Sequence, residues 1–136
     1  MFVIEKPLPA ITEDGEPYWE GCRKGELRAQ RCTACGRFRW PPSVLCPHCL
    51  AEGGEWVRLS GRGTIYSFIV VHRPQHPAFF DDAPYNIAIV ELEEGIRTHT
   101  NVVECPNEDL RVGMPVEVVF HEVDDEVTLP KFRPRR

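Results

Sequence analysis

The sequence predicts a mainly β protein that consists of an N-terminal helical segment, a rubredoxin-like zinc ribbon and a five- to six-stranded OB-fold barrel. Four of its six cysteines stand in two Cys-x-x-Cys pairs, which is the spacing of a zinc ribbon. Thirteen prolines in 136 residues interrupt any long helical pattern. Short apolar runs separated by glycine turns follow from residue 55 onward, as in a small closed barrel.

On this basis we divide the chain into an extended and helical segment over 1–26, the zinc ribbon over 27–54, and the barrel with a basic C-terminal tail over 55–136. The length suits one domain with a small appendage. No run approaches the roughly 18 consecutive apolar residues of a membrane span, and the first residues lack the order of a signal peptide. We therefore expect a cytoplasmic protein without membrane contact.

The first segment predicts a short helix from about residue 16 to 24, which Thr12 or Asp14 caps and which ends at Gly25. A proline lies in its first turn, where prolines are tolerated. A helix this short needs a surface to pack on. Helical spacing places two aromatic rings and a thiol on one side of this helix, those of Tyr18, Trp19 and Cys22. This side packs either on the chain's own core or on another protein.

The two cysteine pairs, Cys32 with Cys35 and Cys46 with Cys49, predict one tetrahedral four-thiolate cage for zinc. Four soft ligands close the coordination sphere, so the ion is structural and no position remains for a substrate. Two alternatives stay open from the residues alone: disulfides, which suit secreted mini-domains, and a rubredoxin-like iron site. The other two cysteines have no partner at such spacing and suit small buried positions.

The second half predicts short strands over 55–59, 64–71, 85–92, 96–103, 116–123 and 127–129. A helical turn is expected only near 107–110, and a 13-residue loop over 72–84. The strand 64–71 carries apolar side chains toward both faces, so the face outside the barrel needs a cover. A partner surface would supply that cover.

Charge and motifs limit the function classes. The formal net charge is −5, and residues 76–129 hold two basic against thirteen acidic side chains, which argues against a polyanion ligand. Single-stranded nucleic-acid binding is nevertheless the main alternative, because OB barrels use aromatic side chains for it. The histidines have no partners that the sequence can place beside a nucleophile, which argues against an enzyme acting alone.

The order of several short motifs adds a resemblance that covers about residues 16 to 133. In sequence they are Gly25-x-Leu27, Cys32-x-x-Cys35-Gly36, Pro41-Pro42, Cys46-Pro47-x-Cys49, Gly61-x-Gly63-Thr64, Val90-x-Leu92-x-Glu94-Gly95, Gly113-Met114-Pro115-Val116 and Pro130-x-Phe132. This set resembles the family of zinc-ribbon and OB-fold proteins, formerly a domain of unknown function, that associate with acyl-CoA-processing thiolase-superfamily enzymes.

The resemblance implies a non-catalytic accessory subunit of a thiolase-superfamily partner, either a 3-oxoacyl-CoA thiolase or a retro-aldolase that shortens sterol side chains. It implies a hetero-oligomer of two plus two chains in which the barrel braces the partner and borders the CoA channel. Tyr18 and Trp19 are the candidate anchors. If CoA comes near, its phosphates need cations, and the candidates at strand ends are Arg62, His72 and Arg73.

Overall fold

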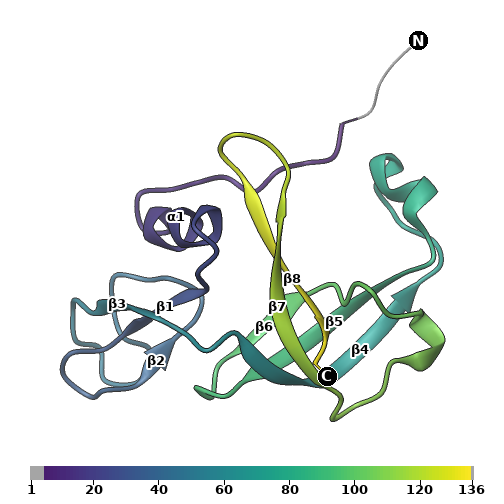
Figure 1. The fold of residues 1–136 in the computed structure, drawn as a ribbon. Helices are drawn as coiled ribbons and strands as arrows, with labels where there is room; N and C mark the ends of the chain where they lie inside the picture. Colours follow the sequence, from purple (N-terminus) through teal and green to yellow (C-terminus); the bar gives the residue numbers. More distant parts are fainter. Residues whose placement is uncertain (1–4, 136) are drawn as a thin grey trace.

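Two antiparallel sheets and one α-helix make up the part of the chain that the computed structural model describes, residues 5–135 (Figure 1). One sheet has three strands in the order β2-β1-β3, and the other has five in the order β6-β5-β4-β7-β8. The first four residues, on which the expectation of no signal peptide rests, lie outside the described residues. No helix over 5–135 is long and apolar enough to cross a membrane.

The helix α1 spans Glu16–Arg23 and ends where the sequence predicts, because Gly25 adopts a left-handed φ of 77°. Pro17 lies in the first turn as expected. The predicted cap is wrong: Gly15 occupies the N-cap position and no side chain caps the helix. Thr12 contributes its backbone carbonyl instead, which accepts a hydrogen bond from the Gly15 N–H at 3.1 Å.

The small sheet consists of β1 (Arg28–Arg31), β2 (Phe38–Arg39) and β3 (Glu55–Arg58). We expected residues 55–59 as the first barrel strand, but β3 pairs with β1 in register from Arg28 opposite Arg58 to Arg31 opposite Glu55. The strand that leaves the zinc ribbon therefore completes the ribbon's own sheet before the chain enters the barrel.

The five-stranded sheet curls into the predicted OB-type barrel. Its strands are β4 (Arg62–Val71), β5 (Tyr85–Leu92), β6 (Arg97–Thr100), β7 (Pro115–Glu122) and β8 (Thr128–Pro134). Two 3-10 turns, η1 (Pro77–Asp82) and η2 (Asn107–Asp109), lie in the long loop and in the segment before β7. A parallel bridge between Val102 and Phe132 joins the β6 side to β8 and closes one end of the barrel.

The C-terminal residues form a core strand and not the basic tail that we expected. Phe132 is only 1% exposed and pairs with Val118 of β7, so the segment after Pro130 belongs to the barrel. The ladder explains why prolines are tolerated here. Val123 donates to the Val127 carbonyl, and in an antiparallel ladder hydrogen-bonded pairs alternate with pairs that are not hydrogen-bonded. Pro130 and Pro134 fall in pairs that are not hydrogen-bonded, where an N–H would point away from β7, so no ladder bond is lost.

The barrel interior is filled by the inward-facing residues of every strand. In β5 burial alternates strictly, with Asn86, Ala88, Val90 and Leu92 inside. Gly63 of β4 lies so close to β5 that a Cβ atom there would stand 2.4 Å from the Glu91 carbonyl oxygen. The strand crossing at this point therefore requires glycine.

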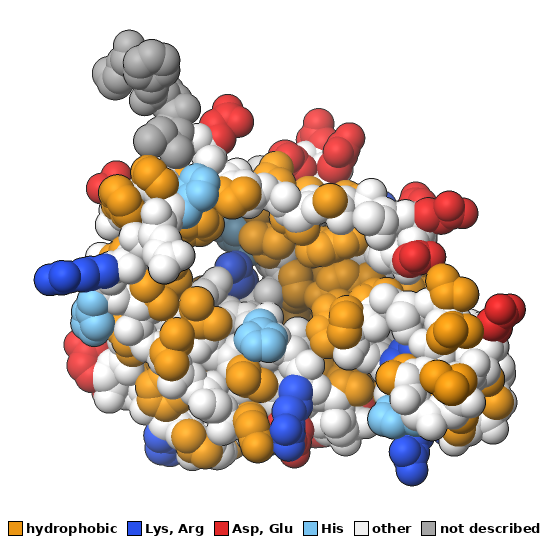
Figure 2. Space-filling model, turned by 180° about the vertical axis from the view of Figure 1, so that it is seen from behind, with side chains coloured by type: hydrophobic (Ala, Val, Ile, Leu, Met, Phe, Trp, Pro, Cys, Tyr) orange, Lys and Arg blue, Asp and Glu red, His pale blue; other side chains and the backbone are white. Residues whose placement is uncertain are grey.

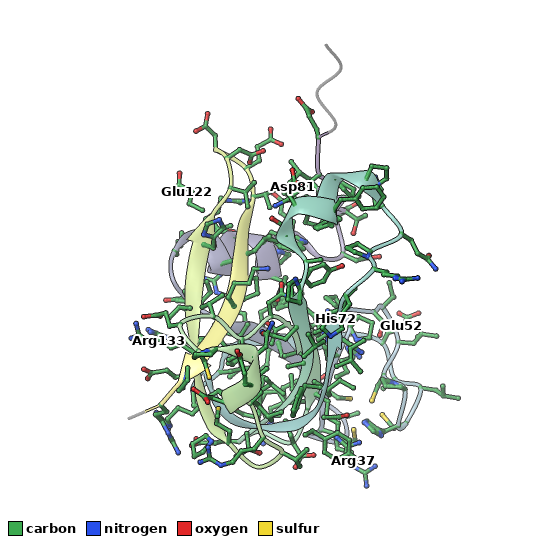
Figure 3. The ribbon with its side chains drawn as sticks, turned by 90° about the vertical axis from the view of Figure 1, so that its right-hand side faces the viewer. Arg37, Glu52, His72, Asp81, Glu122 and Arg133 are labelled. Atoms are coloured by element: carbon green, nitrogen blue, oxygen red, sulfur yellow. The ribbon has the colours of Figure 1, made fainter. Side chains whose placement is uncertain are left out.

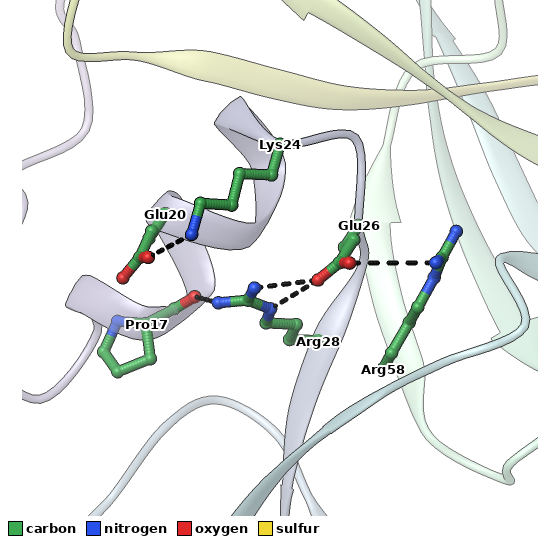
Figure 4. Close-up of polar contacts among 6 residues, drawn as sticks. All are labelled: Pro17, Glu20, Lys24, Glu26, Arg28 and Arg58. Atoms are coloured by element: carbon green, nitrogen blue, oxygen red, sulfur yellow. Dashed lines mark hydrogen bonds and ion pairs between the residues drawn. The ribbon is translucent and has the colours of Figure 1, made fainter.

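An ionic network ties α1 to the ribbon sheet (Figure 4). Arg28 of β1 donates to the Glu26 carboxylate at 2.8 Å and to the Pro17 carbonyl of α1 at 3.3 Å. Arg58 of β3 approaches the other oxygen of Glu26 at 3.7 Å. Below this network the Tyr18 ring lies 4.5 Å from the Trp40 ring, so helix, ribbon and barrel share one core cluster.

Candidate metal centre and partner surfaces

The four cysteines of the two Cys-x-x-Cys pairs converge on one point. Their Sγ atoms all lie within 4.8 Å of one another, with Cys32 to Cys49 and Cys35 to Cys46 both at 3.6 Å. A tetrahedron with zinc–sulfur bonds of about 2.3 Å has edges of about 3.8 Å, so these distances fit a zinc ion. They exceed the sulfur–sulfur bond of about 2.05 Å, which excludes disulfides within this cluster. The predicted zinc site is confirmed; its sulfur atoms gather between the labelled Glu52 and Arg37 in Figure 3.

Both cysteine turns have the same backbone geometry. Gly36 donates to the Cys32 carbonyl at 2.9 Å with a φ of 76°, and Leu50 donates to the Cys46 carbonyl at 2.9 Å with a φ of 64°. The backbone N–H of Cys35 faces the sulfur of Cys32 at 3.4 Å and lowers the pKa of that thiol to about 6. The first turn thus favours the Cys32 thiolate.

Arg39 joins β1 and β2 to the loop that follows the second cysteine pair. It is 2% exposed and donates to Gln30 Oε1 at 3.1 Å and to the Gly53 carbonyl at 2.8 Å. Its Nη1 atom is buried and has no hydrogen-bond partner among residues 5–135.

The predicted partner anchors divide between the core and the surface. Tyr18 and Cys22 are 5% and 1% exposed and pack inside the chain, where burial raises both pKa values, that of Cys22 to about 11. Trp19 is half-buried and reaches the surface beside Tyr18, with the two rings 5.0 Å apart. The helix therefore uses Tyr18 and Cys22 to dock on its own core, and only Trp19 offers a contact outward.

The three candidate CoA contacts do not come together. Arg62 begins β4 and forms an ion pair with Glu93 at 2.9 Å, whereas His72 and Arg73 follow the far end of the strand, about 30 Å of chain away. Arg62 lies in register with Glu117 of β7, at the opposite end of β4 from Val71, which His72 and Arg73 follow. One phosphate cluster cannot contact all three.

The outer face of the β4–β5 ribbon is apolar, as the pattern of residues 64–71 predicts. Ile69 pairs directly with Ile87, and Ser67 pairs with Ile89, on the side opposite the barrel interior. Ile69 is 59% exposed and Tyr66 is 47% exposed, with the Arg97 guanidinium 3.8 Å above the Tyr66 ring. We call this surface, made of Tyr66, Ile69, Ile87 and Ile89, the outer β4–β5 face.

A groove that the sequence did not reveal runs between α1, the N-terminal segment and the strands β6 and β8. Two hollows of about 540 and 550 Å³ share Asn101, Leu129 and Lys131 and make it continuous. In the view of Figure 2 the surface is hollowed and hydrophobic side chains gather in the hollow. One hollow is lined by Trp19, Trp40, Thr98, His99 and Pro130, the other by Leu8, Phe79, Tyr85, His121 and Val123.

Comparison with known proteins gives matches along most of the chain. A family model described as "ChsH2, rubredoxin-like zinc ribbon domain" matches residues 19–53, and "ChsH2, C-terminal OB-fold domain" matches residues 56–121. A solved structure of the "Ltp2-ChsH2(DUF35) aldolase" is 44% identical with a TM-score of 0.84 and covers 93% of this chain and 98% of the compared chain.

Three relatives carry functional names. The "Probable enoyl-CoA hydratase alpha subunit" of Thermomonospora curvata is 44% identical over 95% of this chain, which spans only 40% of that protein's length. A "DUF35 domain-containing scaffold protein" of Methanothermobacter thermautotrophicus is 40% identical over 74% of this chain and 75% of its own. The "Benzoylsuccinyl-CoA thiolase subunit BbsA" of Thauera aromatica is 31% identical over 73% of this chain and 66% of its own.

Proposed function

Because this chain belongs to the ChsH2 family of zinc-ribbon and OB-fold proteins, we propose that it is a non-catalytic accessory subunit of a thiolase-superfamily enzyme acting on an acyl-CoA. The scaffold protein, the thiolase subunit and the aldolase complex among the similar proteins support this proposal. The partner supplies the residues that make and break bonds, and this chain supplies a rigid docking surface. Two catalytic and two accessory chains form the assembly we expect.

The outer β4–β5 face is the observation in this chain that carries the proposal. The strand β4 pairs with β7 only over Arg62–Thr64, so residues 66–71 leave one edge open beside an apolar face. No charged residue or proline protects that stretch. An open, uncharged edge is an aggregation hazard unless another surface covers it, and a permanent partner is such a cover.

The chemistry of the titratable groups also supports a subunit without a catalytic centre of its own. A zinc ion on four thiolates has no open position for a substrate. Over residues 5–135, the four cysteines are the only group of three or more His, Cys, Asp or Glu side chains that could hold a metal. The strongly raised pKa values of Tyr18 and Cys22 arise mainly from burial of the two side chains.

For CoA at the edge of the complex, His72 and Arg73 are the contacts we retain. Both are exposed and follow directly on β4, beside the outer β4–β5 face. Cationic side chains at the rim of a docking surface suit the phosphates of a ligand bound mainly by the partner. Arg62 is already held by Glu93 at the other end of the strand, so we do not include it.

The proposal is tested with the purified chain, a co-expressed thiolase-superfamily protein, and a mixture of the two. We expect stable co-purification and acyl-CoA turnover that requires the catalytic partner and is stimulated by this chain. Turnover of a thioester by this chain alone would contradict the non-catalytic assignment. Failure of every thiolase-superfamily candidate from the source organism to co-purify would contradict the accessory role.

A matched pair of variants locates the interface. Ile69→Asp places a charge on the outer β4–β5 face, and Val44→Asp places one on the zinc ribbon at nearly equal exposure, 59% and 58%. We expect Ile69→Asp to abolish co-purification while both variants remain folded and zinc-loaded. Loss of the complex with Val44→Asp alone would move the interface to the ribbon.

A further inference from the structure

The groove between α1 and the strands β6 and β8 contains a cation without a counter-charge. The side chain of Lys131 is half-buried where the two hollows meet, and its Nζ donates to Asn101 Oδ1. No carboxylate of residues 5–135 lies within salt-bridge distance of it. Burial lowers the pKa of this lysine, and the neighbouring Lys6 adds repulsion. A half-buried, uncompensated ammonium gains from an incoming anion.

The same groove exposes an open strand edge. In the β5–β6 hairpin Leu92 donates to the Ile96 carbonyl, so the ladder bonds continue at Thr98 and Thr100. The N–H and C=O groups of Arg97 and His99 therefore point away from β5. The Asn101 carbonyl on this edge accepts from Phe132 of β8, but the described part of the chain offers Arg97 and His99 no backbone partner.

The opposite wall does not fill this gap. At Pro130 the strand β8 has no N–H to offer, and its carbonyl accepts from the Thr100 hydroxyl at 3.3 Å. The groove is therefore lined on one side by the unpaired peptide group of His99. At its ends lie large apolar side chains, Trp19 and Trp40 in one hollow and Phe79 in the other.

We propose that this groove binds an extended acidic peptide segment of the partner enzyme, added as a strand along the β6 edge with an Asp or Glu carboxylate on Lys131. The free N–H and C=O groups of His99 favour a peptide over a small anion, because only a backbone satisfies both. Alternate side chains of the segment occupy the aromatic ends of the groove. This assignment rests on the proposed function, since the partner supplies the segment.

The first experiment needs no partner. A library of random linear 12-residue peptides is displayed and selected against the full-length, zinc-loaded chain. We expect enriched sequences that share one acidic residue flanked by apolar residues at alternate positions. Enrichment without an acidic residue, or no enrichment at all, would overturn the proposal.

Two variants test the two contacts on the best selected peptide. Lys131→Met removes the charge and keeps the length, and we expect it to weaken binding about tenfold. His99→Pro removes the N–H that points into the groove together with the imidazole ring, at an edge position where proline is tolerated. We expect a comparable loss, which His99→Ala, a variant that removes the ring alone, does not show. Lys24→Met, on the far side of α1, is the control and leaves the affinity unchanged. Equal affinity of Lys131→Met and the unaltered chain refutes the charge contact.

A third measurement identifies the source of the segment in the complex. A photoreactive phenylalanine analogue replaces Leu129, which lines both hollows of the groove, in the chain co-purified with its catalytic partner, and cross-linked peptides are mapped by mass spectrometry. We expect one partner segment that contains an acidic residue. If the complex forms but no partner peptide is cross-linked, the groove proposal fails while the proposed function stands; if no complex forms, both fail.

Discussion

Residues 27–54 and residues 59–135 bury very different side chains. The first stretch buries little that is apolar besides Leu27 and Ala29, together with two of the zinc ligands and the charged Arg39. The second buries a continuous set that includes Ile65, Val90, Leu92, Val102, Val116 and Phe132. The ribbon has too small an apolar core to hold itself together, whereas the barrel has one.

This difference assigns separate roles to metal and to packing. In the ribbon the metal replaces the core, and the short β-pairings of β1 with β2 and β3 only complete what the four thiolates begin. In the barrel no metal is needed, because every strand contributes an inward row to one cluster. Changes that remove zinc should therefore unfold the ribbon, and changes in strand packing should unfold the barrel.

The largest effect is expected from removal of a zinc ligand. Cys32→Ser, or a strong chelator acting on the unaltered chain, withdraws a binding free energy on the order of 10 kcal/mol from the ribbon. We expect the ribbon to unfold, while hydrogen exchange in β5 and β7 stays slow. Full zinc content and slow hydrogen exchange in β1 and β3 of Cys32→Ser would contradict the metal-dependent role assigned to the ribbon.

The next largest effect is expected in the barrel, at Gly63. In Gly63→Ala the new methyl group would stand 2.4 Å from the Glu91 carbonyl oxygen and 2.8 Å from Val90 Cγ1, so β4 and β5 must separate. We expect a loss of about 3 kcal/mol in the free energy of unfolding, measured by urea denaturation of the zinc-loaded protein. The neighbouring exposed Thr64→Ala should cost about 0.5 kcal/mol or less. Equal losses in the two variants would argue against the close crossing.

A smaller effect is expected at the junction between α1 and the ribbon. Arg28→Met removes the charge-assisted bonds to Glu26 and to the Pro17 carbonyl, from a side chain that is 20% exposed. We expect a loss of about 1.5 kcal/mol in thermal unfolding and faster exchange in α1. Lys24→Met is the control, because its pair with Glu20 is exposed to solvent and should contribute little to stability.

The sequence predicted those features that depend on neighbouring residues and missed those that depend on distant ones. The zinc ligands, the end of α1 at Gly25 and the strand Tyr85–Leu92 follow from spacing, turn chemistry and alternation. The strand β8 was missed because Pro130 and Pro134 resemble strand breakers, and only the pairing with β7 puts them where no N–H is needed. An isolated Phe132 among prolines and basic residues was the one local sign of a core strand.

The groove could not have been predicted, because segments far apart in the sequence build it. Lys131 was assigned to a basic tail, and only the barrel closure brings it beside Asn101. Likewise the candidate CoA contacts Arg62 and His72 are both at ends of one strand in the sequence, but they are opposite ends. The rise of about 3.3 Å per residue along this strand separates them by about 30 Å.

The smallest effect concerns the two cysteine turns, which have the same backbone shape but differ in the residue that follows the second cysteine. At the left-handed position after the first pair stands Gly36, and at that position after the second stands Leu50, whose side chain is 73% exposed. A left-handed φ costs a non-glycine residue about 1 kcal/mol. Because the Leu50 side chain is so exposed, its packing offsets little of this cost. Leu50→Gly should therefore strengthen zinc binding by about fivefold in competition with a chromophoric chelator. Gly36→Ala places a Cβ at the matching position and should weaken zinc binding by a similar factor. If Leu50→Gly weakens zinc binding instead, the leucine contributes through a contact within the ribbon that outweighs its backbone strain.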